Sequence, residues 1–277
     1  MPSFAPSKLN SASRNAAALL SRIGWIAFAV FLAVLCAWLL TYAEFRHRLV
    51  LTSLATVLFA SLAWLLRGVN TSGAAAGFIA AFALTLAGGP ATFGAVLLVF
   101  VLTFLATRFG RERKSELHIE ERATGRDGAQ VLANIGCAAL AVTLSQLTPW
   151  HMPLVAGSIA ALAEAAADTV SSETGKALAE NARLLTSWRL VPAGTDGAIS
   201  IPGTVLGIAA AAIVGTEAVA TGMLNARQGA LAVLAAMAGM FIDSLLGATL
   251  ERRGWLRNNG VNLISTGCSV LIAAILV

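Results

Sequence analysis

Two apolar segments of the sequence end in an aspartate followed directly by a hydroxyl residue, and these aspartates are the first candidates for chemistry. Asp168 is followed by a threonine and Asp243 by a serine. Carboxylates at the end of an apolar segment are costly and therefore informative. If the two segments run in the same direction, their carboxylates converge on one site, and oxygen ligands suit Mg²⁺. The alternative is that each aspartate caps a helix or pairs with a loop arginine; Glu164, one turn earlier, either extends the site or faces the bundle interior.

A turn-rich segment at 192–200 offers a second kind of site. It contains Gly194, Thr195, Asp196 and Gly197 and leads into an apolar segment. Its glycines allow backbone N–H groups to converge on an anion, and the start of the following helix adds positive potential. Any tight turn uses the same residue types, so an ordinary turn is the alternative.

Basic and amide residues gather around a third region. Lys114 and Arg126 precede an apolar segment; they could pair with phosphate, or simply reflect the enrichment of Lys and Arg in cytoplasmic loops. Gln130 and Asn134 lie one turn apart and are expected to face inward together. Asn262 lies near the start of the last apolar segment, where a buried amide needs a hydrogen-bonding partner.

The elements that must position these residues are membrane-spanning helices. The 277 residues are 57% hydrophobic and 12% charged, whereas soluble domains carry about 25% charged residues. The apolar runs approach the ~20 residues that cross ~30 Å of hydrocarbon as a helix, and the alternation typical of strands is absent. We therefore predict an all-α, polytopic transmembrane bundle of about nine spans, at 24–40, 49–66, 73–88, 91–107, 130–147, 152–168, 201–222, 228–247 and 261–277.

The distribution of charge predicts the orientation. With nine spans and a cytoplasmic N-terminus, all but three of the 19 Lys and Arg residues fall on the cytoplasmic side, the exceptions being Arg46, Arg48 and Arg227. This matches the excess of Lys and Arg found in cytoplasmic loops. The same bias accounts for the net charge of +5, so no nucleic-acid partner is expected. The site is expected on the cytoplasmic face, where the connections are long.

The predicted organisation has three parts. Residues 1–23 form a cytoplasmic tail, 24–66 an N-terminal extension of two spans that begins with a signal anchor, and 67–277 the main membrane domain. The lipid bilayer is the first expected partner. The expected location is the cell membrane, or the plastid envelope if the source is a plant.

Five motifs in a fixed order carry a family resemblance. They begin at residues 126, 167, 192, 242 and 258 and read RDGAQVLANIG, ADTVSSETGK, PAGTDGAIS, IDSLLGATLE and NNGVNL. In these motifs the chain resembles the integral-membrane family catalogued as domain of unknown function ninety-two, which includes transmembrane protein nineteen and the plant phytyl-phosphate kinase. The resemblance covers about residues 67–277. Glu251 departs from the family pattern, which has Gln there.

The resemblance implies a membrane-embedded kinase that transfers a phosphoryl group from a nucleoside triphosphate to an isoprenyl, phytyl-like monophosphate. On this hypothesis Mg²⁺ is held by Asp168 and Asp243 with Glu173, and charge on the transferred group is neutralised by Lys114, Arg126 and Lys176. Substrate would contact the candidate binding residues Gln130, Asn134, Gly194, Thr195, Asp196, Gly197 and Asn262. The alternative is an ion-coupled transporter of lipid or small solute without enzymatic activity, whose carboxylates relay protons or Na⁺.

Overall fold

The computed structural model describes residues 43–116 and 125–277. The chain divides into a unit at Met1–Leu51 and a larger unit at Thr52–Val277. Only the first residues of helix α2 are described in the smaller unit. The predicted tail, the predicted span at 24–40 and the loop residue Arg122 therefore lie outside the described residues.

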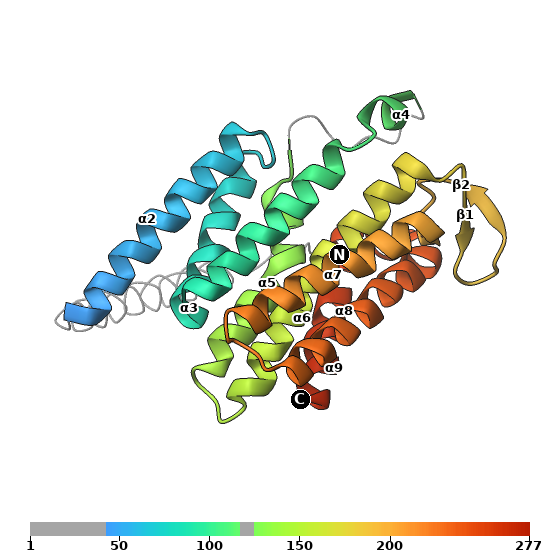
Figure 1. Ribbon diagram of the computed structural model, residues 1–277. Helices are drawn as coiled ribbons and strands as arrows, with labels where there is room; N and C mark the ends of the chain where they lie inside the picture. Colours follow the sequence, from blue (N-terminus) through green and yellow to red (C-terminus); the bar gives the residue numbers. More distant parts are fainter. Residues whose placement is uncertain (1–42, 117–124) are drawn as a thin grey trace, which may run out of the picture. The chain divides into compact units, whose positions relative to one another are not determined.

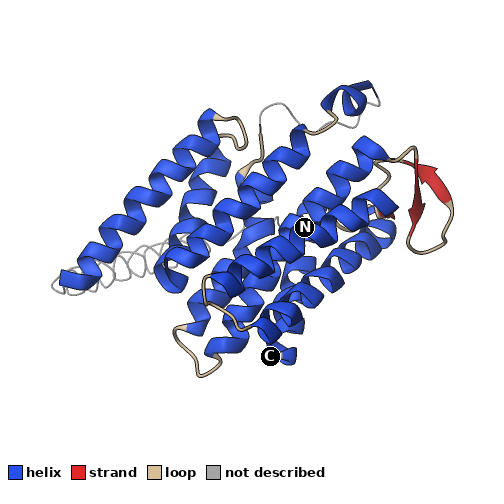
Figure 2. Cartoon of the chain, in the orientation of Figure 1, coloured by secondary structure: helices blue, strands red, loops and turns tan. Residues whose placement is uncertain are grey.

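Helices make up most of the described chain (Figure 2). Seven helices among the described residues are long and apolar enough to cross a membrane. The helical elements are α2 (Ala43–Leu65), α3 (Thr71–Arg108), α4 (Arg111–Glu116), α5 (Gly128–Ser145), α6 (His151–Leu178), α7 (Ile201–Ala220), α8 (Ala226–Leu246), a π-helical turn η1 (Gly247–Glu251) and α9 (Asn258–Leu276). The predicted helical membrane bundle is confirmed.

Helix α3 is a hairpin of two arms rather than one span. Its 38 residues would reach about 57 Å as a straight helix, nearly twice the hydrocarbon thickness. Gly89 breaks it with φ 83° and ψ −173°, a backbone region that glycine enters freely, and Pro90 follows. Gly68, just before the first arm, lies against Phe100 in the second, so the chain turns back on itself (Figure 1). The two arms correspond to the predicted spans 73–88 and 91–107.

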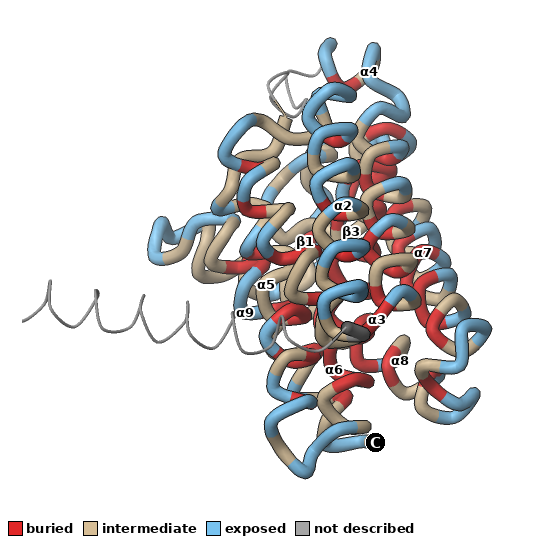
Figure 3. Tube along the Cα trace, turned by 90° about the vertical axis from the view of Figure 1, so that its left-hand side faces the viewer, coloured by how far each residue is buried: buried red, intermediate tan, exposed pale blue. Residues whose placement is uncertain are grey.

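Helix α6 forms the centre of the larger unit. It contacts α3, α5, α7, α8 and α9, and most of its residues between Val155 and Ala177 are buried (Figure 3). Its middle is rich in alanine, and small side chains let several helices approach one axis closely. Residues on α6 are therefore surrounded by protein even though the helix has the composition of a membrane span.

Glycines of α7 allow the closest of these approaches. A Cβ atom on Gly207 would lie 2.8 Å from the backbone oxygen of Ala167 on α6, so a larger residue would push the helices apart. Gly203, one turn earlier, lies against the backbone oxygen of Ser171 in the same way. Spacing of small residues every fourth position thus serves helix packing here.

The connection from α6 to α7 contains strands that the sequence patterns did not predict. Strands β1 (Asn181–Leu184), β2 (Leu190–Pro192) and β3 (Ala198–Ile199) form an antiparallel sheet in the order β2-β1-β3. The sheet lies beyond the helix ends (Figure 2), where strands do not have to satisfy their edges in lipid. It fixes the segment that leads into α7.

The long connections of the larger unit gather at one end, which we call the basic end. It carries the α2–α3, α3–α5, α6–α7 and α8–α9 connections (Figure 1). Of the thirteen Lys and Arg residues described after Leu51, Arg227 alone lies at the opposite end, at the start of α8. This is the end that the sequence analysis predicts to face the cytoplasm.

Candidate functional site

A cavity of about 150 Å³ opens at the basic end beside α6, α8 and the loop before β3. We call it the acidic cavity, because the charged residues in its lining are Asp168, Lys176, Asp196, Asp243 and Glu251. The lining of this small volume thus has four carboxyl groups and one lysine. Serines and glycines of α6, α8 and η1, with Ser200 at the N-cap of α7, form much of the remaining wall.

Asp168 and Asp243 meet in this cavity although they lie on different helices. Their carboxyl groups are within hydrogen-bonding reach of each other. The Ser265 hydroxyl of α9 donates a hydrogen bond to Asp243 Oδ2 at 3.2 Å. Two carboxylates at this separation repel strongly in a low-dielectric setting, so the pair requires a cation or a shared proton between its oxygens.

Glu164 lies deeper in the bundle, one turn before Asp168 on α6. Its side chain is 1% exposed, and its Oε1 atom has no hydrogen-bond partner among the described residues. Gly239 of α8 packs against it, since a Cβ there would lie 2.8 Å from Glu164 Cγ. Glu164 therefore faces the bundle interior and does not line the acidic cavity. It still lies close enough to Asp168 and Asp243 for the charges of the three carboxyl groups to interact.

The loop predicted to bind an anion forms one wall of the acidic cavity. Gly194, Thr195, Asp196 and Gly197 all line it. Part of the loop's hydrogen-bonding capacity is used internally, because the Thr195 amide donates to the Pro192 oxygen at 3.3 Å. Gly197 has φ 70° and its backbone lies directly against η1. The glycines therefore bring the loop onto α8 and η1, which closes the cavity.

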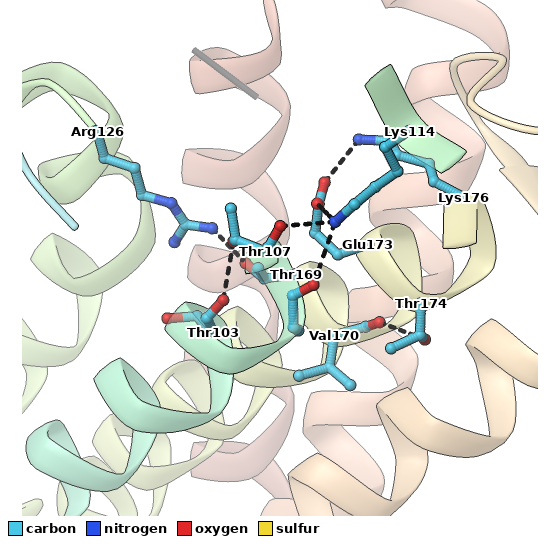
Figure 4. Close-up of polar contacts among 10 residues, drawn as sticks. Thr103, Thr107, Lys114, Arg126, Thr169, Val170, Glu173, Thr174 and Lys176 are labelled. Carbon is cyan, nitrogen blue, oxygen red and sulfur yellow. Dashed lines mark hydrogen bonds and ion pairs between the residues drawn. The ribbon is translucent and has the colours of Figure 1, made fainter. Parts of the chain in front are cut away.

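Glu173, unlike the aspartates of the acidic cavity, lies between two lysines, Lys114 and Lys176 (Figure 4 shows these three side chains). Its Oε2 pairs with Lys114 Nζ at 2.7 Å and its Oε1 with Lys176 Nζ at 2.8 Å. The side chains of Lys114 and Glu173 are only 1% and 7% exposed, so this is a buried ion pair. The predicted grouping of Glu173 with Asp168 and Asp243 as metal ligands is not formed, because both of its oxygens are paired with lysines.

Lys114 does not occupy the predicted phosphate-binding position, because its ammonium is bonded to other groups of the protein. Its ammonium donates to the backbone oxygens of Thr107 at 2.6 Å and Ala106 at 3.3 Å, and with Glu173 this accounts for its three donors. It lines neither the acidic cavity nor the apolar cavity defined below. Lys114 instead ties α4 to the end of α3 and to α6, whereas Lys176 does line the acidic cavity.

Arg126 reaches α6 at Thr169, the residue next to Asp168. Its Nη2 atom donates to Thr169 Oγ1 at 3.4 Å, which places its charge close enough to act on Asp168. Arg126 does not line the acidic cavity. The charges of Arg126 and Lys176 thus both act on Asp168.

The predicted amide residues divide into a helix cap and a pair. Gln130 forms a capping box with Asp127 at the start of α5, with hydrogen bonds of 2.9 Å in both directions. This is a correction to its predicted inward-facing role, because its side chain is committed to the backbone. Asn262 Nδ2 donates to Asn134 Oδ1 at 3.2 Å, so the nitrogen of this buried amide has a partner within the bundle, whereas its Oδ1 has none among the described residues.

A second cavity, of about 140 Å³, was missed by the sequence analysis. We call it the apolar cavity; it lies between α2, both arms of α3 and α5, and it touches α6 at Ala165. Phe59, Val96 and Phe100 represent its apolar lining, and Asn134 also contributes. No local sequence pattern predicts this cavity, because its walls are made mostly of apolar residues typical of any membrane span. Arg67 and Arg108, which the sequence analysis used only to predict orientation, lie in its lining beside Arg126.

The donor set of the acidic cavity fits a hard cation, though not a cage made by protein alone. Its carboxylates and hydroxyls are all oxygen ligands, the kind that Mg²⁺ prefers. Within residues 43–116 and 125–277, no group of three His, Cys, Asp or Glu side chains is arranged to hold a metal ion. Mg²⁺ commonly binds through one or two carboxylates completed by water and substrate phosphates, and Asp168 with Asp243 suits that mode.

Comparisons with known proteins agree with the membrane architecture. The profile of a family described as integral membrane protein DUF92 matches residues 54–270, beginning within α2 rather than at the predicted boundary of 67, which stays a prediction. The chain is 33% identical to the uncharacterized membrane protein sll0875 of Synechocystis, over 64% of this chain and 70% of that one.

Two further relatives come from an archaeon and a plant. Identity to the uncharacterized membrane protein MJ0933 of Methanocaldococcus jannaschii is 36%, over 62% of this chain and 70% of that one. The chain is 28% identical to the chloroplastic protein VTE6 of Arabidopsis thaliana, over 76% of this chain and only 66% of the plant protein. No solved structure matches the chain significantly.

Proposed function

This chain belongs to the integral membrane protein family DUF92, and from that premise we propose that it is a kinase acting at the membrane surface. The reaction would transfer the terminal phosphoryl group of a nucleoside triphosphate to an isoprenyl monophosphate. The resemblance of its motifs to those of plant phytyl-phosphate kinases supports the lipid class. The geometry of the two cavities supports the reaction type.

The acidic cavity carries the proposal. Asp168, Asp243, Asp196 and Glu251 face one lysine there, so a triphosphate entering alone would be repelled. A nucleotide accompanied by Mg²⁺ removes that conflict, because the cation lies between carboxylates and phosphates of like charge. Asp168 and Asp243 would hold the Mg²⁺, which when bound neutralises charge developing on the phosphoryl group.

The position of the second cavity supports a lipid acceptor. The apolar cavity touches α6 at Ala165 and the acidic cavity touches it at Asp168. Three residues along a helix correspond to about 4.5 Å. An acceptor phosphate held near Arg126 would therefore lie next to the terminal phosphate of a nucleotide in the acidic cavity, which is the proximity that phosphoryl transfer needs.

The residues around Asp168 would then act as follows. An oxygen of the acceptor monophosphate attacks the terminal phosphorus of the nucleotide, the bond to the bridging oxygen breaks, and the nucleoside diphosphate leaves. Arg126 and Lys176 would neutralise charge from the acceptor and nucleotide sides. Gly194 and Gly197 would let the loop backbone approach the nucleotide closely. The acceptor phosphate is already ionised near neutral pH, so the transfer requires no general base.

One observation favours a second candidate, an ion-coupled transporter. Glu164 is a carboxyl group deep in the bundle with an unpartnered oxygen, and carboxylates in that position commonly bind coupling protons or cations. A transporter would carry ions or solute and consume no nucleotide. The kinase is the better supported candidate because the excess of carboxylates lies at the basic end, where soluble nucleotide can enter.

The test uses the purified full chain in detergent or nanodiscs. It is incubated with Mg²⁺, with each nucleoside triphosphate in turn, and with dimethylallyl, geranyl, geranylgeranyl or phytyl monophosphate. The proposal expects lipid diphosphate and nucleoside diphosphate to form together in equal amounts. If none of these pairs reacts, while the same protein in liposomes moves protons or Na⁺, the transporter replaces the kinase.

A further inference from the structure

The apolar cavity has a composition gradient that suits a lipid with an anionic head. At the basic end its lining includes Arg67, Arg108 and Arg126, and toward the middle of the bundle it includes Phe59 and Val96. Counting along the second arm of α3, Arg108 and Val96 are separated by about 18 Å. A groove with cationic residues at one end and hydrocarbon walls along such a depth is complementary to a single-chain lipid phosphate.

The arginines at this end are held in defined positions. Arg108 Nη2 donates to the Leu66 backbone oxygen at 2.6 Å, and its guanidinium lies 4.0 Å from the centre of the Phe104 ring. Arg67, two residues after the end of α2, has φ 57°, the left-handed conformation that helix ends usually assign to Gly or Asn. An arginine accepts this conformation at some cost in energy, and here it places the side chain in the cavity lining.

We propose that the apolar cavity is the binding site for the prenyl chain of the acceptor and that Gly77 sets how much of that chain it admits. This inference rests on the proposed kinase function and assigns its lipid subsite. The phosphate lies among Arg67, Arg108 and Arg126, and the chain runs between α2, α5 and the two arms of α3. The head therefore lies next to the acidic cavity, on the neighbouring face of α6, while the chain lies among apolar side chains.

Gly77 is the position where cavity size can be changed without breaking the fold. It lies in the cavity wall one turn below Gly73. A Cβ on Gly77 would meet only Val131 Cγ1, at an ordinary contact distance of 3.8 Å, whereas a Cβ on Gly73 would collide with the backbone of Arg126. Gly77 is thus free to grow into the cavity, and Gly73 is not.

The test is photo-crosslinking of geranylgeranyl monophosphate with a diazirine on its last isoprene unit. In wild-type protein without nucleotide, the label is expected on peptides containing residues 59–77 or 96–104. Gly77→Leu should reduce labelling about tenfold or more, by filling the path of the chain, and should leave competition by dimethylallyl monophosphate nearly unchanged. Arg67→Gln should weaken binding of the monophosphate but not of the uncharged prenyl alcohol.

Gly136→Leu is the matched control, since Gly136 lies on α5 outside the cavity lining and a Cβ there meets only Leu132 of its own helix at 4.0 Å. Label on α7 or α8 peptides, equal labelling of Gly77→Leu and wild type, or stronger competition by diacyl phosphatidic acid would each overturn the prenyl site. Crosslinking needs no phosphoryl transfer. If the cavity is labelled but the protein transfers no phosphoryl group, only the proposed function is rejected. If phosphoryl transfer occurs but the label is found on other segments, only this lipid subsite is rejected.

Discussion

Asp168 and Glu173 lie five residues apart on α6, yet the fold gives them opposite environments. Both oxygens of Glu173 are bonded to lysines, at 2.7 and 2.8 Å. Asp168 faces a cavity and has another carboxyl group, that of Asp243, within hydrogen-bonding reach. The charge of Glu173 is balanced by two lysines, whereas the Asp168–Asp243 pair requires a cation or a shared proton between its oxygens.

This difference separates a structural from a functional use of the same chemical group. A buried carboxylate with two ammonium partners anchors neighbouring elements and has no free oxygen for a ligand. A carboxylate pair beside a cavity is destabilising unless a cation or proton lies between its oxygens. Closely spaced like charges of this kind are typical of binding sites. The four predictions that follow test the contrast.

The largest effect is expected from Lys114→Met. Removing the ammonium leaves Glu173 buried with one partner instead of two, and breaking a buried pair costs about 3–5 kcal/mol. Thermal unfolding in detergent should therefore show a much lower Tm, while activity per folded molecule changes little. Adding Glu173→Gln should recover part of the loss. An unchanged Tm for Lys114→Met would show that the pair does not hold α4 in place.

Asp168→Asn should act on activity and leave folding intact. The amide has nearly the shape of the carboxylate, so only the charge available to a cation is lost. We expect phosphoryl transfer to fall by about two to three orders of magnitude, with a raised Mg²⁺ requirement and a Tm that does not fall. Glu217→Gln, which removes a partly buried carboxylate on α7 outside both cavities, is the control. Full lipid-dependent nucleotide consumption by Asp168→Asn would exclude this residue from the mechanism.

Lys176→Met should reduce activity less than Asp168→Asn, because Lys176 belongs to both environments. This lysine pairs with Glu173 but also lines the acidic cavity, and its side chain is 23% exposed. Solvent screens a partly exposed charge, so we expect the nucleotide KM to rise a few-fold and kcat to change less. The difference from wild type should shrink as ionic strength is raised. A loss as large as that of Asp168→Asn would mean that Lys176 contacts the transferred group.

Asn134→Ala should produce the smallest change. It removes the acceptor of the 3.2 Å hydrogen bond from Asn262, and hydrogen bonds between membrane helices average about 0.6 kcal/mol. A slightly lower Tm is expected, with little effect on transfer. A loss of prenyl phosphate binding beyond that of the Gly136→Leu control would instead show that Asn134 contacts the lipid from its place in the apolar cavity.

Several features could be predicted from local sequence alone. The apolar runs indicate membrane helices because the free energy of transfer into hydrocarbon depends on composition over about 20 residues. Even the two arms of α3 are apparent, since Gly88-Gly89-Pro90 interrupts a run that is too long for one crossing. Asp168 and Asp243 stand out as carboxylates at the ends of apolar segments. The roles suggested for these two residues remain predictions.

Other features were decided only when distant segments came together. A glutamate is a common metal ligand, so the residue type of Glu173 suggested that role. Nothing nearby in the sequence indicates that Lys114, 59 positions away, forms an ion pair with one of its oxygens. The apolar cavity is bounded by α2, α3, α5 and α6, each an ordinary span by itself. Local sequence patterns indicate the free energy of placing a segment in lipid or in water. The partner of a charge and the shape of a void depend on distances between helices, which only the packed bundle determines.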